Sequence, residues 1–364
     1  MERGEGKVVV VAGASAGVGR AVAVEFGRHG WTVALLSRGR EGLDAAKREI
    51  EALGGRAATY PLDVADAEAV MAAADAIERD LGPIEVWVGN AMVTTYSRIV
   101  DTPPQEFRRV TEVTYLGQVH GMLAALKHMR PRNRGAIVSI GSALAYRSIP
   151  LQAAYCAAKA ATRGFVDSLR SELMMEGSAI KLTMVHLPAV NTPQFDWARS
   201  RLPRKLAPLP PIFQPEAIAR AAYRAAHERP REYWIGRSAV QAIVGQMLAP
   251  GVADTVLARR GPEAEMTAEP ADPDRPDNLY EAGRGAPGAH GRFDEQAGDS
   301  VFAFNPAVLR GAAGVLAGAL ALGALRGLWA SLPKPERAAP RPGEKGGALR
   351  PSRGFGPVED RSTS

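Results

Sequence analysis

Two hydrophobic patterns alternate along the first 250 residues of the chain. Short runs of Val, Ile and Leu without polar alternation predict strands that are buried on both faces, as in a parallel sheet. These runs fall at residues 8–12, 32–36, 57–62, 84–88, 136–140, 181–186 and 232–235. Longer Ala-rich stretches between them predict helices at residues 18–29, 43–53, 67–81, 104–129, 152–175, 215–227 and 239–247. We therefore expect an α/β fold, with a single doubly wound Rossmann-type domain over residues 1–250 and a parallel seven-stranded sheet.

Beyond this domain we expect an extended C-terminal tail in three parts. Residues 251–305 are acidic and rich in Pro and Gly, which predicts a segment that is disordered or drapes over the surface. Residues 306–332 contain a charge-free run at 311–325 and are expected to form one apolar helix. Residues 333–364 are rich in Pro, Gly, Arg and Ser, which predicts a disordered basic tail.

The apolar helix has two interpretations. Its charge-free run of 15 residues would span ~22 Å, short of the ~30 Å hydrocarbon core of a bilayer. Continued to Leu332, it would be long enough if Arg326 snorkels. Membrane association through residues 311–332 and packing against protein both stay open.

Charge is unevenly distributed along the chain. Residues 1–250 hold 31 basic and 24 acidic residues, a net charge of +7, whereas residues 251–300 carry −6 and residues 301–364 carry +5. No basic run contains interleaved aromatics, which argues against nucleic-acid binding. Cys156 is the single cysteine and no apolar signal stretch begins the chain, so we expect a cytoplasmic location. The histidines lack the spacing of a zinc site, and we expect no metal.

A glycine-rich turn joins the first predicted strand to the first predicted helix. Gly13, Gly17 and Gly19 would allow a tight turn and a close approach to a pyrophosphate at the helix N-terminus. Ser15 and Val18 belong to the same turn. The turn therefore predicts a nucleotide site, and a turn without a ligand is the alternative.

The residues after the second strand indicate which nucleotide binds. An NAD site carries an acid near this position, but here Ser37 and Arg38 follow the strand. The planar guanidinium of Arg38 suits a 2′-phosphate, and Ser37 adds a hydroxyl donor. We therefore favour NADP(H) over NAD(H), whereas a solvated Arg38 would leave the cofactor undecided.

Three polar side chains form a candidate reaction centre. Tyr155 and Lys159 are four residues apart on a predicted helix and share one face. Positive charge beside a phenol favours its ionised form, so Lys159 and an oxidised nicotinamide would lower the pKa of Tyr155. Ser142 follows the strand at 136–140, where its hydroxyl could reach a carbonyl oxygen held near Tyr155. Ser139 is the rival hydroxyl, and we expect it to pack within the strand.

These motifs, in this order, resemble the short-chain dehydrogenase/reductase (SDR) superfamily of the Gly-x-x-x-Gly-x-Gly and Tyr-x-x-x-Lys type. The resemblance covers residues 7–250 and implies a homodimer. It implies that Asp63 and Val64 contact the adenine and that Asn90 stabilises the central strands. It also implies cofactor contacts at the nicotinamide end from Pro188, Val190 and Thr192.

One departure from the family concerns proton relay. The family has an asparagine that anchors a relay water where this chain has Thr114. Its hydroxyl or carbonyl could hold that water, so we include Thr114 with Ser142, Tyr155 and Lys159 as catalytic candidates and expect an altered relay.

The stretch at residues 190–213 is expected to form the substrate lid. It is rich in large apolar residues, which suggests a lipophilic ketone, aldehyde or alcohol. Its cations could meet a membrane surface or an acidic substrate, or simply be solvated. The sequence thus predicts an NADP(H)-dependent oxidoreductase that interconverts a carbonyl and an alcohol, with a non-catalytic NADP-binding sensor or scaffold as the alternative.

Overall fold

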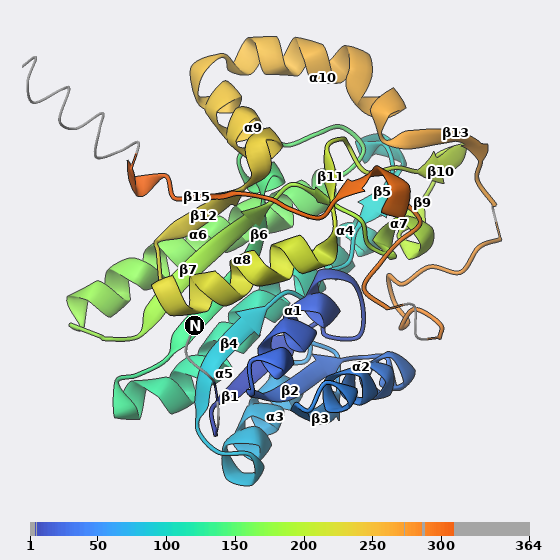
Figure 1. Cartoon of the computed structure of the whole chain (residues 1–364). Helices are drawn as coiled ribbons and strands as arrows, with labels where there is room; N and C mark the ends of the chain where they lie inside the picture. Colours follow the sequence, from blue (N-terminus) through green and yellow to red (C-terminus); the bar gives the residue numbers. More distant parts are fainter. Residues whose placement is uncertain (1–3, 5, 273, 286–287, 309–364) are drawn as a thin grey trace, which may run out of the picture. The chain divides into compact units, whose positions relative to one another are not determined.

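The predicted parallel sheet is present in the computed structural model, which describes residues 4, 6–272, 274–285 and 288–308 (Figure 1). Its strand order is β3-β2-β1-β4-β6-β7-β12, and all of these neighbours pair in parallel. The seven strands are β1 (Val8–Ala12), β2 (Thr32–Ser37), β3 (Arg56–Pro61), β4 (Ile84–Gly89), β6 (Ala136–Ser142), β7 (Lys181–Leu187) and β12 (Glu232–Ile235). An eighth strand, β15 (Ala303–Phe304), pairs antiparallel with β12. The sheet is therefore mostly parallel, and its antiparallel edge was not predicted.

Helices cover both faces of the sheet (Figure 1). Helices α1, α2 and α8 share one apolar core with the sheet, and α3, α4, α5 and α6 share the other. The helices are α1 (Gly17–Arg28), α2 (Arg40–Ala52), α3 (Ala67–Asp80), α4 (Pro104–Thr111), α5 (Gly117–Arg132), α6 (Ala153–Met175), α7 (Gln194–Trp197), α8 (Pro215–Glu228), α9 (Gly236–Leu248) and α10 (Pro250–Ala264). This arrangement is the doubly wound fold that the sequence predicts.

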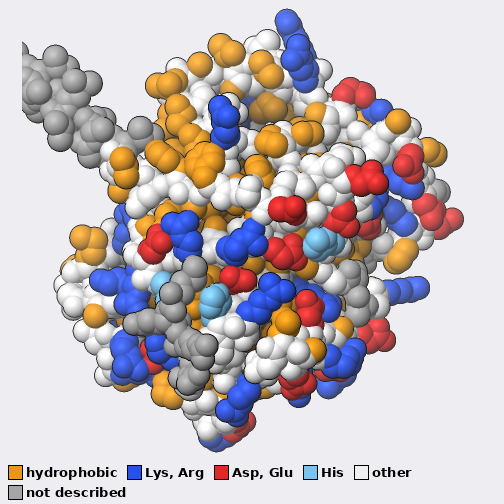
Figure 2. Space-filling view, viewed as in Figure 1, with side chains coloured by type: hydrophobic (Ala, Val, Ile, Leu, Met, Phe, Trp, Pro, Cys, Tyr) orange, Lys and Arg blue, Asp and Glu red, His pale blue; other side chains and the backbone are white. Residues whose placement is uncertain are grey.

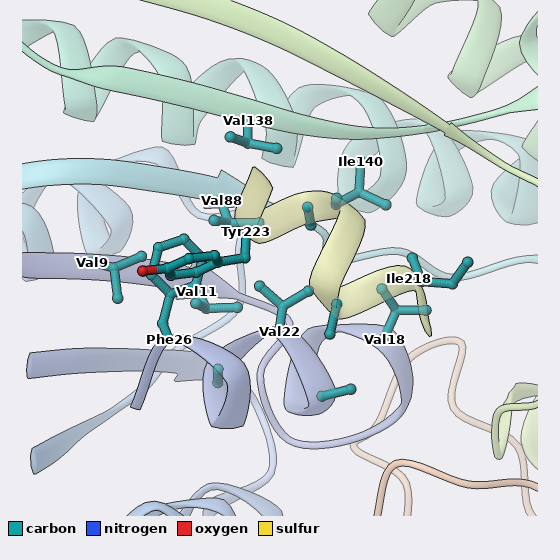
Figure 3. Close-up of a cluster of buried hydrophobic side chains, with 14 of the residues drawn as sticks. Val9, Val11, Val18, Val22, Phe26, Val88, Val138, Ile140, Ile218 and Tyr223 are labelled. Carbon is teal, nitrogen blue, oxygen red and sulfur yellow. The ribbon is translucent and has the colours of Figure 1, made fainter. Parts of the chain in front are cut away.

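Strand β1 shows why its sequence lacks polar alternation. Val9 and Val11 point into the core shared with α1 and α8, where Phe26 and Tyr223 stack edge to face at 4.9 Å (Figure 3). Val8 and Val10 point into the opposite core, and all four valines are fully buried. A strand buried on both faces must be apolar at every position.

The single helix predicted at residues 104–129 is wrong in its middle. A π-helical turn, Glu112–Leu116, separates α4 from α5. It includes Thr114, whose hydroxyl accepts a hydrogen bond from the N–H of Val93 and donates one to the carbonyl of Val93. Single π-turns inside helices are frequent at functional sites.

The acidic extension at residues 251–305 drapes over the sheet domain, and the structure gives it regular elements. Helix α10 was not predicted, and the Gly261-Pro262 pair lies in its last turn. Three short strands follow: β13 (Met266–Pro270), β14 (Ala297–Gly298) and β15. β13 pairs with β10 (Arg204–Leu206), and β14 pairs with β11 (Ile212–Phe213). The extension therefore pairs through two short strands with strands of the predicted lid.

The predicted apolar helix and basic tail lie outside the described residues, apart from the first residues of the helix at 306–308. Within the described part of the chain, no helix is both long and apolar enough to cross a membrane.

Candidate active site

A cavity of about 420 Å³ lies where the carboxyl ends of β1, β4, β6 and β7 open, the usual position of a ligand in a doubly wound sheet. Most of the site residues predicted from sequence line this cavity. They are Gly13, Ser15, Gly17, Val18, Ser37, Arg38, Asp63, Val64, Asn90, Ser142, Tyr155, Lys159, Pro188, Val190 and Thr192. Gly19 and Thr114 are not among the residues that line it.

Helix α6 carries Tyr155 and Lys159 on one face, as their spacing predicts. The Lys159 ammonium lies 5.7 Å from the centre of the Tyr155 ring. It donates a 2.7 Å hydrogen bond to the carbonyl of Ile140 on β6. Lys159 is only 2% exposed, so a long cationic side chain is held inside the protein beside the phenol.

Burial controls the pKa values of this pair. It lowers the pKa of Lys159 from 10.5 to about 8, because the charged form loses its hydration. It raises the pKa of Tyr155, and a hydrogen bond with the Ser142 hydroxyl only partly offsets the effect. In the protein without its cofactor, burial therefore outweighs the hydrogen bond with Ser142. The lowering expected from Lys159 together with an oxidised nicotinamide stays a prediction.

Ser142 is the last residue of β6 and is 7% exposed. Its hydroxyl accepts from the backbone N–H of Leu144 at 3.1 Å. Its carbonyl accepts from Nδ1 of the buried His186 at 3.1 Å, which fixes the strand end. Ser139 is fully buried and bonds Gln118, in agreement with its predicted packing role.

The glycine turn brings β1, α1 and β4 into close contact. Gly13 has a φ of +82°, and a Cβ there would lie 2.7 Å from the Cα of Ala91. A Cβ at Gly19 would lie 2.0 Å from the carbonyl oxygen of Gly13, so this glycine permits packing of helix on strand. Asn90 donates to the same carbonyl at 3.3 Å and joins β4 to the turn. The start of α1 thus has the backbone form of a pyrophosphate cradle, although the N–H of Gly17 donates here to the carbonyl of Gly288 at 3.0 Å.

Thr114 stands where the family has its water-anchoring asparagine, but its hydroxyl is already bonded to the backbone of Val93. Its hydroxyl donates to the carbonyl of Val93 at 2.8 Å and accepts from the N–H of Val93 at 3.0 Å. The residue is fully buried. The hydroxyl proton is therefore engaged, and one lone pair of the hydroxyl oxygen remains for a water.

Arg38 lies at the nucleotide end, but it is not a solvated loop charge. Its guanidinium donates to the carbonyls of Asn278 and Tyr280 at 2.6 and 2.9 Å, and more weakly to Leu279 at 3.4 Å. Its neighbour Ser37 shares a 2.9 Å hydroxyl contact with Ser15 of the glycine turn. Backbone groups from the extension thus orient the residue predicted to recognise a 2′-phosphate.

Asp63 has partners that the sequence did not reveal. One carboxylate oxygen accepts from the N–H of Ala65 at 3.0 Å, and the other pairs with Arg109 of α4. Arg109 also donates to the carbonyl of Leu279 at 3.0 Å. Two guanidiniums, Arg38 and Arg109, therefore surround one carboxylate, and these three groups together carry one net positive charge.

The predicted lid is held down by ion pairs. Arg199 and Arg201 bind the buried carboxylate of Glu106 at 3.0 and 2.7 Å. Arg204 and Lys205 pair with Glu263 and Glu269 of the extension. Figure 2 shows acidic and basic side chains side by side over this upper right part of the molecule. Three of these lid cations, Arg199, Arg204 and Lys205, therefore form ion pairs with the acidic extension, a partner that was not predicted.

Glu265, at the end of α10, is a cavity residue that sequence reasoning missed. It is 1% exposed, and its Oε2 accepts from Gln152 at 2.9 Å. Burial raises its pKa from 4.5 to about 7, and the bond from Gln152 partly opposes this. The sequence gives no reason to single out this glutamate from the other acidic residues around it, because only the fold brings it beside α6.

Known proteins are similar to this chain in sequence and in structure. Residues 7–202 match the family model described as short chain dehydrogenase. The chain is 30% identical over 281 residues to the uncharacterized oxidoreductase YxnA of Bacillus subtilis (strain 168), covering 77% of this chain and 79% of that protein. It is 35% identical over 188 residues to the putative oxidoreductase SadH of Mycobacterium tuberculosis, covering 52% of this chain and 68% of SadH.

A solved structure agrees with this assignment. The crystal structure of a metagenomic short-chain oxidoreductase in complex with NADP has a TM-score of 0.53 and 27% identity, covering 62% of this chain and 92% of that one. With the glycine turn, Ser142, Tyr155 and Lys159 arranged around one cavity, the chain belongs to the short-chain dehydrogenase (SDR) family of oxidoreductases, with an additional C-terminal region.

Proposed function

We propose that this protein is an NADP(H)-dependent oxidoreductase that interconverts a carbonyl and an alcohol by hydride transfer, acting on a lipophilic substrate. The observation that carries the proposal is the convergence of Ser142, Tyr155 and Lys159 at one end of the cavity. A bound nicotinamide supplies the hydride for reduction or accepts it in oxidation. The side chains hold the substrate oxygen and move its proton.

Each of the three side chains has a distinct task in carbonyl reduction. Tyr155 donates its phenolic proton to the substrate oxygen, and the Ser142 hydroxyl donates a hydrogen bond to the same oxygen. Lys159, with a pKa of about 8, is mostly protonated at pH 7. Its charge favours the phenolate left on Tyr155, and we expect its ammonium to bind the ribose as well.

Arg38 supports the choice of NADP(H). The carbonyls that bind Arg38 are neutral, and Asp63 is already paired with Arg109, so Arg38, Arg109 and Asp63 together keep one net positive charge. Charge-assisted bonds to a phosphate are stronger than bonds to neutral carbonyls. The similar metagenomic oxidoreductase was crystallised with NADP, which points in the same direction.

The apolar character of the cavity supports a lipophilic substrate. Leu144, Ile149, Leu209 and Leu257 line the part contributed by the loop before α6, the lid and α10. Such walls bind the hydrocarbon part of a ligand through burial, while a few polar groups fix its orientation.

The alternative is a non-catalytic protein that binds NADP as a sensor or scaffold. The observation that favours it is the commitment of the Thr114 hydroxyl to Val93, which leaves less of this side chain for proton relay.

Turnover separates the two functions. Full-length protein is incubated with NADPH and a panel of lipophilic ketones and aldehydes, and the loss of NADPH absorbance is followed. We expect oxidation of NADPH that depends on the carbonyl and is at least tenfold slower with NADH. Tight NADPH binding without turnover on any carbonyl would instead support the sensor.

A further inference from the structure

Part of the C-terminal extension lies across the nucleotide end of the cavity. We call residues 277–285 and 288–291 the wall segment; in Figure 1 it belongs to the orange stretch that descends from β13 on the right. Four of its residues line the cavity: Asn278, Ala282, Gly283 and Gly285. The wall segment therefore borders the same space as the glycine turn.

The first part of the wall segment is fixed by both apolar and polar contacts. Leu279 is fully buried in the core shared with α3 and α4. Its carbonyl accepts from Arg109, and its neighbours' carbonyls accept from Arg38. Asp277 pairs with Arg199 of the lid at 2.7 Å, so lid and wall segment are joined.

The far part of the wall segment reaches the start of α1. The N–H of Gly17, in the glycine turn, donates to the carbonyl of Gly288 at 3.0 Å. Gly291 lies so close to Thr192 that a Cβ there would be 2.4 Å from its carbonyl oxygen. The wall segment thus touches both ends of the predicted cofactor site, from Arg38 to Thr192.

One polar atom of the wall segment suggests a ligand contact. Oδ1 of Asn278 is buried and has no hydrogen-bond partner among the described residues. Buried acceptors without a partner are rare unless a ligand or water supplies the missing donor. Amino and hydroxyl groups on the adenosine part of a dinucleotide are donors of the required kind.

We propose that the wall segment forms the outer wall of the cofactor site, so that NADP(H) binds beneath it and is released only when it moves away. This inference rests on the NADP(H) dependence proposed above. In it, the three carbonyls of residues 278–280 orient Arg38 toward the 2′-phosphate, and Asn278 accepts a hydrogen bond from the adenosine part. Leu279 anchors the wall segment in the core.

The rate of cofactor release tests the proposal without relying on turnover. Full-length protein is loaded with NADPH, and the decay of bound NADPH fluorescence is followed after mixing with excess NADP⁺. Leu279→Ala removes the anchor, and Asp277→Ala removes the pair with Arg199. Glu281→Gln is the matched control, since Glu281 is exposed within the same segment.

We expect release to be roughly tenfold faster or more in Leu279→Ala, faster in Asp277→Ala and unchanged in Glu281→Gln. Hydrogen exchange in residues 277–285 of the wild type should slow when NADPH binds. If one variant fails to fold, the other variant and the exchange measurement still decide.

Unchanged release in both variants would overturn the proposal. So would tighter NADPH binding in Leu279→Ala, because the wall segment would then compete with the cofactor for Arg38 and Gly17. Wild-type protein that binds NADPH but reduces no carbonyl would contradict the proposed function alone. Wild-type protein that binds no NADPH would contradict both.

Discussion

Lys159 lies beside the ring of Tyr155, with Nζ 5.7 Å from the ring centre, yet its hydrogen bond goes to the carbonyl of Ile140. The ammonium is therefore positioned by β6, not by the phenol. Its charge remains close to Tyr155 while burial disfavours that charge. The site thus holds a cation where the proposed chemistry needs one, at a cost in stability that can be measured.

Replacing Lys159 should stabilise the protein while removing activity. Burial lowers its pKa from 10.5 to about 8, so the penalty is fully present below pH 8 and absent above pH 10.5. At pH 7 this penalty is up to about 3 kcal/mol. Lys159→Met removes this penalty but also loses the hydrogen bond to Ile140. The free energy of unfolding should therefore rise by about 1–2 kcal/mol at pH 7. Urea unfolding at pH 7 and pH 10 measures it, and the gain should shrink at pH 10.

The exposed Lys181 provides the matched control, since Lys181→Met should change stability by less than about 0.5 kcal/mol at both pH values. A Lys159→Met protein that is less stable than wild type at pH 7 would show that the ammonium is not penalised by burial.

Thr114 should contribute measurably to stability through Val93. Thr114→Val leaves the buried N–H and carbonyl of Val93 without this partner, which should cost about 1–3 kcal/mol. Thr114→Ser keeps the hydroxyl and should lose much less. Urea unfolding compares the two variants, and equal stabilities would remove the structural role assigned to the hydroxyl.

Glu265 should make stability fall as the pH rises. Its pKa is raised from 4.5 to about 7 by burial, so no penalty applies below pH 4.5 and the full penalty applies above pH 7. Glu265→Gln retains an acceptor for Gln152 and should be more stable than wild type by up to about 3 kcal/mol at pH 8. Thermal unfolding at pH 5 and pH 8 checks this, with Glu263→Gln in the exposed pair with Arg204 as control. A pH-independent difference would refute the assignment.

Arg38 should decide between the two nicotinamide cofactors. Arg38→Leu should raise the Kd for NADPH by roughly ten- to a hundredfold, because charge-assisted phosphate bonds are lost, and change the Kd for NADH far less. Arg40→Leu, two residues away and exposed, should bind both cofactors as wild type does. Titrations of wild type and both variants with each cofactor, followed by cofactor fluorescence, give the dissociation constants, and equal losses for NADPH and NADH would exclude recognition of the 2′-phosphate by Arg38.

The sequence predicted the seven parallel strands, and most of them, such as β1 and β4, are apolar runs that the core requires on both faces. The edge strand β3 is only half-buried, and its prediction rested on its place in the alternation of strands and helices. It missed β15, which has only two residues and pairs because the chain returns to β12. It also missed α10, whose exposed valines, Val252 and Val256, give a weak pattern. Local patterns identify elements with a buried face, and they fail where pairing depends on distant segments.

The candidate site divides in the same way. Tyr155, Lys159 and Ser142 could be predicted, because helical spacing and a strand end bring them together. Arg109, Glu265 and the wall segment could not, because their contacts join residues that are 46 to 242 positions apart. The implied homodimer stays a prediction.

Transfer of a labelled hydride tests the central claim most directly. Wild-type protein is supplied with NADPH carrying deuterium at the transferable position, together with a carbonyl that it reduces, and the alcohol product is analysed by mass spectrometry. We predict one deuterium on the carbinol carbon, and a rate in Tyr155→Phe that is lower by roughly a hundredfold or more although NADPH still binds. An unlabelled product, or an undiminished rate in Tyr155→Phe, would contradict the mechanism.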